Sequence, residues 1–202
     1  MFSPRVARRS LKRYRAKGLG RLERMILASA GAHGFEDARV LEIGGGIGAL
    51  HSELLSAGAA SGEVVELASA YEPYARELAR ERGLESRTTF RVADVLERPE
   101  DVQPAAIVLL NRVVCCSPEG VRLAGAAARL AQRTFVFSFP RDRMLVRAGI
   151  RLANAWLWLL GRSFRVFLHP PPALVGAVEA EGLRVVDRGR VALWEFAALE
   201  RP

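Results

Sequence analysis

The chain has 202 residues and a mass of 22.1 kDa, the size of one domain, so it has no room for a second full catalytic domain. Half of the residues are hydrophobic and 26% are charged, which excludes disorder, collagen and small disulfide scaffolds. The formal net charge of +8 is concentrated in residues 1–24, which carry nine basic side chains against the single acid Glu23. The rest of the chain is neutral, so the basic character belongs to an N-terminal arm that favours anionic surfaces.

Hydrophobic periodicity after this arm predicts a regular alternation of helices and strands. Leu19, Leu22, Met25 and Ile26 recur at helical spacing, and this helix leads into Gly31. Apolar strands and amphipathic helices then alternate, with strands at 40–43, 64–67, 88–92, 105–110 and 134–139 and helices at 47–57, 71–82 and 118–131. Because helices of this length connect parallel strands by right-handed crossovers, we expect a doubly wound α/β sandwich.

The pattern changes after Pro140. A basic and aromatic segment spans residues 141–165, and a helix that begins at the triple proline 170–172 ends at Gly182. Two more strands follow, at 183–186 and 191–196, and the short link 187–190 between them indicates a hairpin. The sequence therefore predicts a seven-stranded, mostly parallel sheet with a C-terminal antiparallel hairpin strand. We expect an arm and helix at 1–34 and one domain at 35–202 with an insertion at 141–165.

The first strand opens into a glycine-rich loop, Gly44-Gly45-Gly46-Ile47-Gly48. Glycines at this place let the backbone turn sharply and bring its N–H groups close to a ligand at the carboxyl edge of the sheet. The loop fits two patterns. Gly44, Gly46 and Ala49 match the nicotinamide fingerprint, whereas Gly44, Gly46 and Gly48 match the tighter pattern of S-adenosylmethionine enzymes.

Acidic residues at the ends of three consecutive strands favour the second pattern. Glu42 precedes the loop, where its charge would repel a pyrophosphate but could hold the ammonium group of a methionine moiety. Glu66 ends the next strand, at the spacing of a carboxylate that accepts both ribose hydroxyls. Asp94 ends the third, where it can accept from an adenine amino group while Val95 packs against the ring. Three carboxylates in this register suit a cationic sulfonium cofactor.

This layout resembles a class I S-adenosylmethionine-dependent methyltransferase from Val40 to the last strand. The resemblance implies S-adenosylmethionine as cofactor, bound by Glu42, Gly44, Gly45, Gly46, Gly48, Glu66, Leu67, Asp94, Val95 and Asn111. The motifs at 137–140, 165–169 and 194–196 are similar, more loosely, to magnesium-protoporphyrin O-methyltransferases and related bacterial enzymes. The chain departs from that narrower family at the end of the fourth strand, where Asn111-Arg112 stands in place of an acid.

The segment 141–165 is the expected lid over the methyl acceptor. It combines arginines with an apolar centre, which suits an acceptor that is greasy and anionic, and it supplies Arg141, Arg143 and Trp156 as candidate acceptor-binding residues beside Arg112. Two other interpretations stay open for this segment. It could pack its apolar face on the body while its arginines reach solvent. Alternatively, together with residues 1–24, it could rest on an anionic membrane surface.

His169 is the candidate catalytic residue, for proton transfer or for orienting an acceptor oxygen, because it precedes the triple proline at the expected pocket rim. We expect no metal, since His33 and His51 have no partners with ligand spacing and the adjacent Cys115 and Cys116 do not supply them. We also expect no disulfide from these cysteines, which fits a reducing compartment.

The residues between the twin-arginine-like motif at 8–12 and the small residues at 28–30 include five further basic side chains, so we expect no export signal. We expect a cytoplasmic protein, peripheral to the inner membrane face if the basic segments bind lipid.

The sequence thus favours methyl transfer to a hydrophobic, anionic small molecule such as a tetrapyrrole, quinone or carboxylate. Three alternatives remain. An RNA methyltransferase would use the arm to bind phosphates, although the fourth strand lacks the Asn/Asp-Pro-Pro-aromatic signature of base-methylating enzymes, which disfavours a nucleic-acid partner. A nicotinamide oxidoreductase would use the other glycine pattern. A non-catalytic membrane-surface module would keep only the fold.

Overall fold

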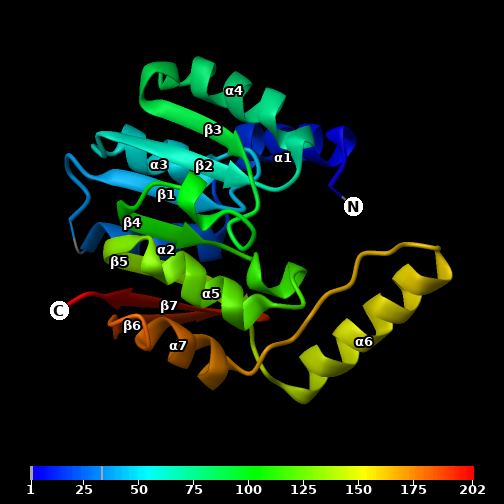
Figure 1. Cartoon of the computed structure of the whole chain (residues 1–202). Coiled ribbons are helices and arrows are strands. Elements are labelled where there is room, and N and C mark those ends of the chain that lie inside the picture. The colour runs from blue at the N-terminus through cyan, green and yellow to red at the C-terminus, as the bar shows by residue number, and fades with distance from the viewer. Residues whose placement is uncertain (1, 33) are drawn as a thin grey trace.

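The computed structural model describes residues 2–32 and 34–202 and shows one seven-stranded sheet with helices on both faces (Figure 1). The strand order is β3-β2-β1-β4-β5-β7-β6. The strands are β1 (Arg39–Ile43), β2 (Ser61–Glu66), β3 (Thr88–Val92), β4 (Ala105–Leu110), β5 (Ala131–Pro140), β6 (Arg184–Val191) and β7 (Trp194–Glu200). The first five are parallel, and β7 runs antiparallel between β5 and β6. The predicted fold class is confirmed.

The helices form two layers, each with its own core. One face carries α1 (Pro4–Lys17), α2 (Arg21–Ala32), α3 (Ala49–Ser56) and α4 (Glu72–Glu81), and the other carries α5 (Gly120–Arg129) and α7 (Pro171–Glu179). Successive residues of the central strands alternate between the cores: Ile107 packs with the first set of helices and Val108 with the second. Strands covered on both faces must be apolar throughout, which explains the continuous hydrophobic run of β4.

Residues 4–17 of the basic N-terminal arm form helix α1, which is docked on the body of the protein. Ala7, Leu11 and Tyr14 recur at helical spacing along α1 and are buried in the core beneath it. Tyr14 donates a hydrogen bond to Glu53 Oε1 (2.5 Å), and Arg15 is paired with glutamates of α4. This apolar stripe, rather than the charge, fixes the N-terminal segment against the body.

The C-terminal hairpin turns at a different place from the predicted one. Residues 187–190 lie inside β6 and pair with β7, and the turn is at Ala192-Leu193. β6 is an edge strand, so only alternate side chains face the protein and the others can be polar. Its polar residues at 187–190 therefore resembled a turn. Gly189 is required there by the ring of Phe196, whose Cε1 would lie 2.2 Å from an added Cβ.

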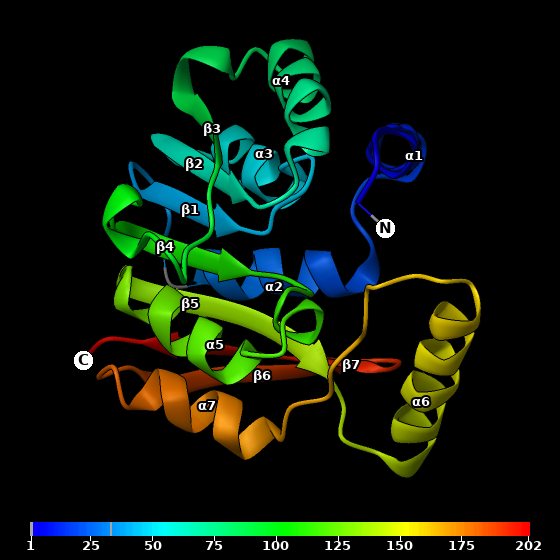
Figure 2. The ribbon, with the colours of Figure 1, turned by 45° about the vertical axis from the view of Figure 1, so that its right-hand side comes forward.

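Within residues 141–165 the chain forms α6 (Met144–Leu159), which stands away from the two packed layers (Figure 2). Val146 is its one buried residue. The expected lid is therefore a helix beside the body in this structure.

Candidate functional site

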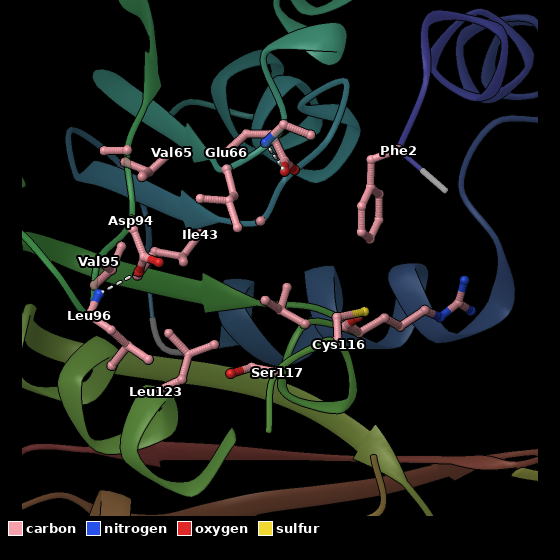
Figure 3. Close-up of a pocket in the computed structure, with 16 residues that line it drawn as sticks. Phe2, Ile43, Val65, Glu66, Asp94, Val95, Leu96, Cys116, Ser117 and Leu123 are labelled. Carbon is pink, nitrogen blue, oxygen red and sulfur yellow. Dashed lines mark hydrogen bonds between the residues drawn. The ribbon is translucent and has the colours of Figure 1, made fainter. Parts of the chain in front are cut away.

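A pocket opens at the carboxyl edge of the parallel strands and is called the carboxyl-edge pocket below (Figure 3). It encloses about 930 Å³ not filled by protein atoms, part of it open to solvent, and its wall is mainly apolar. It is lined by Phe2, Ile43, Gly44, Val65, Glu66, Leu67, Ala68, Ala93, Asp94, Val95, Leu96, Arg112, Val113, Cys116, Ser117 and Leu123. The ends of β1, β2, β3 and β4 thus meet at one site, as expected for ligand binding in open α/β sheets.

The glycine loop has left-handed backbone at three positions: Gly44 (φ 66°), Gly46 (φ 58°) and Gly48 (φ 68°). Ala49 is the first residue of α3. The left-handed positions are therefore Gly44, Gly46 and Gly48, which is the pattern typical of S-adenosylmethionine enzymes. The third position of the nicotinamide pattern, Ala49, is helical and does not require glycine. At Gly44 a side chain is also excluded by space, because an added Cβ would lie 2.4 Å from Val113 Cγ2.

Glu66 joins this loop to the end of β2. Its Oε2 accepts from the Gly46 N–H (2.9 Å) and its Oε1 from the Ala68 N–H (3.0 Å). These two bonds fix the orientation of a carboxylate that is buried yet lines the pocket. Since each carboxylate oxygen can accept more than one hydrogen bond, acceptor capacity remains for a ligand hydroxyl pair.

Glu42 lies beneath the glycine loop. It is not part of the pocket wall, its Oε2 accepts from the His51 N–H (3.1 Å), and its carboxyl group would contact any side chain at Gly45. Burial raises the pKa of Glu42 to about 8, and the nearby carboxylates of Glu66 and Glu23 act in the same direction. In this structure Glu42 supports the loop from below, and its contact with an ammonium group stays a prediction.

His51 packs under the same loop. Burial lowers its pKa to about 4, with Arg39 acting in the same direction. Within the described residues, neither ring nitrogen has a hydrogen-bond partner. The buried ring therefore fills space between α3 and Gly62, whose added Cβ would lie 2.3 Å from it.

The third acid lies where the sequence placed it. Asp94 lines the pocket, and its Oδ1 accepts from the Leu96 N–H (2.8 Å), which leaves Oδ2 for a ligand. Val95, Leu96 and Leu123 surround it with apolar surface (Figure 3). This combination of one acceptor and a flat apolar wall suits a purine ring that carries an amino group.

The end of β4 is fixed by hydrogen bonds to β5. Ser138 donates to Asn111 Oδ1 (2.7 Å) and accepts from the Arg112 N–H (2.9 Å), so Asn111 is held outside the pocket wall. Arg112 does line the pocket, in a left-handed conformation (φ 59°) that is rare for residues other than glycine. Its guanidinium group pairs with Glu23 Oε1 (3.0 Å) and lies over the ring of Trp194.

The remaining predicted residues lie elsewhere. His169 is not in the pocket wall; its Nε2 is 2.9 Å from the Ser117 carbonyl oxygen, and its ring packs against Gly120. Arg141 reaches the Ala192 carbonyl oxygen, while Arg143 and the 64%-exposed Trp156 belong to the α6 region. The structure therefore assigns His169 an anchoring contact and does not bring these three side chains to the site.

The pocket includes residues that the sequence did not single out. Ile43, Val65 and Leu96 are direct neighbours of predicted residues, so extending each strand end by one position would have found them. Phe2 had no such signal, because its place in the wall depends on how α1 docks. Cys116 is also a lining residue.

Cys115 and Cys116 are free thiols whose sulfur atoms lie 4.0 Å apart. The mutual contact raises the pKa of Cys115 and lowers that of Cys116. Within residues 2–32 and 34–202 no group of three or more His, Cys, Asp or Glu side chains is arranged to hold a metal ion. His33, named in the sequence, lies outside the described residues.

No family model and no curated protein matches the sequence. Solved structures, by contrast, match its fold. Magnesium protoporphyrin IX methyltransferase from Synechocystis, with bound S-adenosylhomocysteine, superposes with a TM-score of 0.73 at 18% identity, over 90% of this chain and 82% of that one. An O-methyltransferase family 2 protein from Planctomyces limnophilus, in complex with apigenin, gives 0.74 at 18% identity, over 100% of this chain and 62% of that one. An O-methyltransferase family protein from Burkholderia thailandensis gives 0.71 at 21% identity, over 90% of this chain and 56% of that one. The chain therefore has the class I methyltransferase fold.

The raised pKa of Glu42 predicts a pH-dependent stability. Below its ordinary pKa of 4.5 the carboxyl group is protonated in both the folded and unfolded chain, and between 4.5 and about 8 only the unfolded chain ionises. Stability is therefore lost as pH rises through this window. Glu42→Gln removes the titration and keeps an acceptor for the His51 amide. Between pH 5 and pH 8 we expect the free energy of unfolding of this variant to rise by about 3 to 4 kcal/mol relative to that of the unmodified chain.

Urea denaturation at pH 5, 6.5 and 8 measures this difference. Glu97→Gln, at an exposed position in the loop after β3, is the control and should differ from the unmodified chain by the same amount at every pH. A pH-independent difference for Glu42→Gln would show that this carboxyl group ionises normally in the folded chain.

Proposed function

We propose that the carboxyl-edge pocket binds S-adenosylmethionine and that the chain transfers its methyl group to a hydrophobic, anionic small molecule. The observation that carries this proposal is the convergence of Gly44, Glu66 and Asp94 in one pocket, each following a different parallel strand. The solved structures with the same fold that contain S-adenosylhomocysteine or S-adenosylmethionine support the choice of cofactor.

The residues present fit a nucleoside. Glu66 is fixed by two backbone amides and retains acceptor capacity for two ribose hydroxyls, while Asp94 Oδ2 is available for an adenine amino group. Val95 and Leu123 supply the apolar surface on which the ring would lie. The loop at Gly44 admits no side chain, so a ligand can approach its backbone closely.

When bound, S-adenosylmethionine supplies a methyl group on a cationic sulfur that is open to in-line displacement. The protein then has mainly to align the acceptor and exclude water. Phe2, Leu67 and Val113 give the pocket an apolar rim for the second task. A carboxylate acceptor is already ionised at neutral pH, so its methylation needs no general base. The position of His169 outside the pocket wall is compatible with such a reaction.

Arg112 is the residue to which we assign binding of the methyl acceptor. It is the cationic side chain among those that line the pocket, and Glu23 and Trp194 hold its guanidinium group in place. Its strained backbone at the pocket edge is of the kind that clusters at functional sites. Together with the apolar wall, Arg112 supports a greasy acceptor with a negative charge, in the chemical range of the tetrapyrrole and flavonoid named for two neighbours of the same fold.

Glu66→Gln tests the ribose contact. We expect it to weaken S-adenosylhomocysteine binding by about 10- to 100-fold, because a charged acceptor of two hydrogen bonds is replaced by an amide. Isothermal titration calorimetry measures the affinity, with exposed Glu97→Gln as the matched control that retains it. Binding of NADH in place of S-adenosylhomocysteine would overturn the cofactor assignment, and binding of neither would indicate a non-catalytic module.

Gly46→Leu tests the glycine loop. A Cβ at Gly46 would lie 3.4 Å from the Tyr71 ring, and a leucine would distort the backbone whose N–H binds Glu66. We expect S-adenosylhomocysteine binding to be lost. Gly83→Leu is the control, since Gly83 has the same left-handed backbone (φ 66°) with open space around it, at the end of α4. Equal affinities in the two variants would show that the loop is not the binding element.

Arg112→Gln tests the acceptor contact. Transfer of labelled methyl from S-adenosylmethionine to a panel of hydrophobic carboxylates, phenols and porphyrins would be followed by organic extraction. We expect the acceptor KM to rise at least about tenfold and Arg112→Lys to recover part of the loss, while S-adenosylhomocysteine affinity changes little. Arg122→Gln, at an exposed position on α5, is the control. An unchanged acceptor KM would remove Arg112 from acceptor binding.

A further inference from the structure

Helix α6 exposes an apolar stripe that the rest of the protein does not cover. Leu145, Leu152, Trp156 and Leu159 are 86%, 72%, 64% and 68% exposed. Their spacing of i, i+7, i+11 and i+14 places them on one side of the helix. Large apolar side chains that are grouped in this way on a surface mark an interaction site.

The stripe faces away from the protein. The opposite side of α6 carries Val146, Ile150, Asn154 and Leu157, which are buried or half-buried. Asn154 donates to the Val166 carbonyl oxygen and accepts from the Val166 N–H, both at 2.8 Å. The chain that returns from α6 thus holds its inner side, so the outer side is presented in a fixed direction.

Positive charge accompanies the stripe. Arg143, Arg147, Arg151, Arg162 and Arg165 lie on or beside α6, and Asp142 is the only acid between residues 141 and 165. Asp142 pairs with Arg147 (2.6 Å), so four of the five arginines have no carboxylate partner among the described residues. A helix with an apolar stripe flanked by arginines and tryptophans is typical of the interface of an anionic bilayer.

Helix α1 adds charge on the same side of the molecule. Arg5, Arg9 and Lys12 recur at i, i+4 and i+7, opposite the buried residues of α1. Figures 1 and 2 both show α1 and α6 flanking the edge toward which β1, β2 and β4 point. Phe2, in the wall of the carboxyl-edge pocket, contacts Phe164 just after α6 with ring centroids 5.6 Å apart. The two basic helices therefore border the pocket.

We propose that α1 and α6 form a surface that binds an anionic lipid bilayer, with the stripe of α6 inserted at headgroup depth and the pocket opening toward the lipid. A hydrophobic acceptor dissolved in the bilayer would then reach the pocket without crossing water; this last step rests on the proposed function, whereas lipid binding does not. Within the described residues no helix has the length and hydropathy to cross a membrane.

A bilayer fits the surface better than the other occupants. In a dimer formed through the stripe, the arginines of two copies would lie close together and repel each other. RNA phosphates would pair with the arginines but would leave the exposed leucines unexplained. Anionic headgroups above an apolar layer match both features at once.

Vesicle co-sedimentation tests the proposal with the full chain. We expect tight binding to phosphatidylcholine vesicles that contain phosphatidylglycerol, weak binding to pure phosphatidylcholine, and a loss of affinity as salt is raised. Tryptophan emission should shift to the blue on binding, because two of the three tryptophans are on α6.

Two variant pairs locate the surface. Leu152→Glu with Trp156→Glu should weaken binding more than about tenfold, whereas Val186→Glu, at a 45%-exposed apolar position on β6, should leave it unchanged. Arg5→Gln with Arg9→Gln should cost about fivefold for each charge removed, whereas Arg184→Gln with Arg188→Gln on β6 should cost little. Equal losses in the test and control variants would overturn the proposal.

The other occupants and the proposed function are separated by parallel measurements. The lipid assignment would be overturned if the unmodified chain is a dimer that dissociates in the Leu152→Glu, Trp156→Glu variant. It would also be overturned if the unmodified chain binds RNA but not vesicles and the same variant loses RNA binding. Calorimetry with S-adenosylhomocysteine on the same variants should give unchanged affinity. Vesicle binding without S-adenosylhomocysteine binding would contradict the methyltransferase proposal and leave the membrane proposal intact. S-adenosylhomocysteine binding without vesicle binding would contradict the membrane proposal and leave the methyltransferase proposal intact.

Discussion

The glycine loop after β1 is held between two carboxylates, and the site depends on this arrangement. Glu66 binds the Gly46 amide from the pocket side, and Glu42 binds the His51 amide from below. The loop needs such support because it has three left-handed residues and few side chains to pack. The two acids differ in burial: Glu42 has its pKa raised by its enclosed position, whereas Glu66 remains at the pocket surface. Glu42 thus supports the loop, whereas Glu66 is also available to a ligand.

Much of the fold could be predicted because parallel strands covered on both faces have to be apolar along their whole length. The run that became β4 has this composition, and glycines mark where α3 begins and α4 ends. The hairpin was misplaced for the converse reason. At the sheet edge β6 alternates exposed and half-buried side chains, and charged residues that are normal there resemble a turn.

The candidate site could be predicted where a residue's role follows from its place at a strand end. Glu66 and Asp94 reached the pocket because the carboxyl ends of parallel strands meet at one edge of the sheet. The contact of Glu42 with the His51 amide could not be predicted, because it depends on which face of the strand the side chain takes, and Glu42 takes the face beneath the loop. His169 could not be placed at all from spacing, because its contact with Ser117 joins two segments far apart in the chain.

The sequence also could not show that its two basic segments lie near each other in the fold. From the sequence, residues 1–24 form an independent electrostatic segment, and the arginines after Pro140 form a second one. The fold brings both to the edge of the sheet where the pocket opens, and the contact of Phe2 with Phe164 joins them. An amphipathic helix that packs on its own protein turns its apolar side inward, whereas α6 turns Leu145, Leu152 and Leu159 outward beside its arginines. In the proposed membrane surface the charge and the apolar stripe would act on one partner, the anionic bilayer.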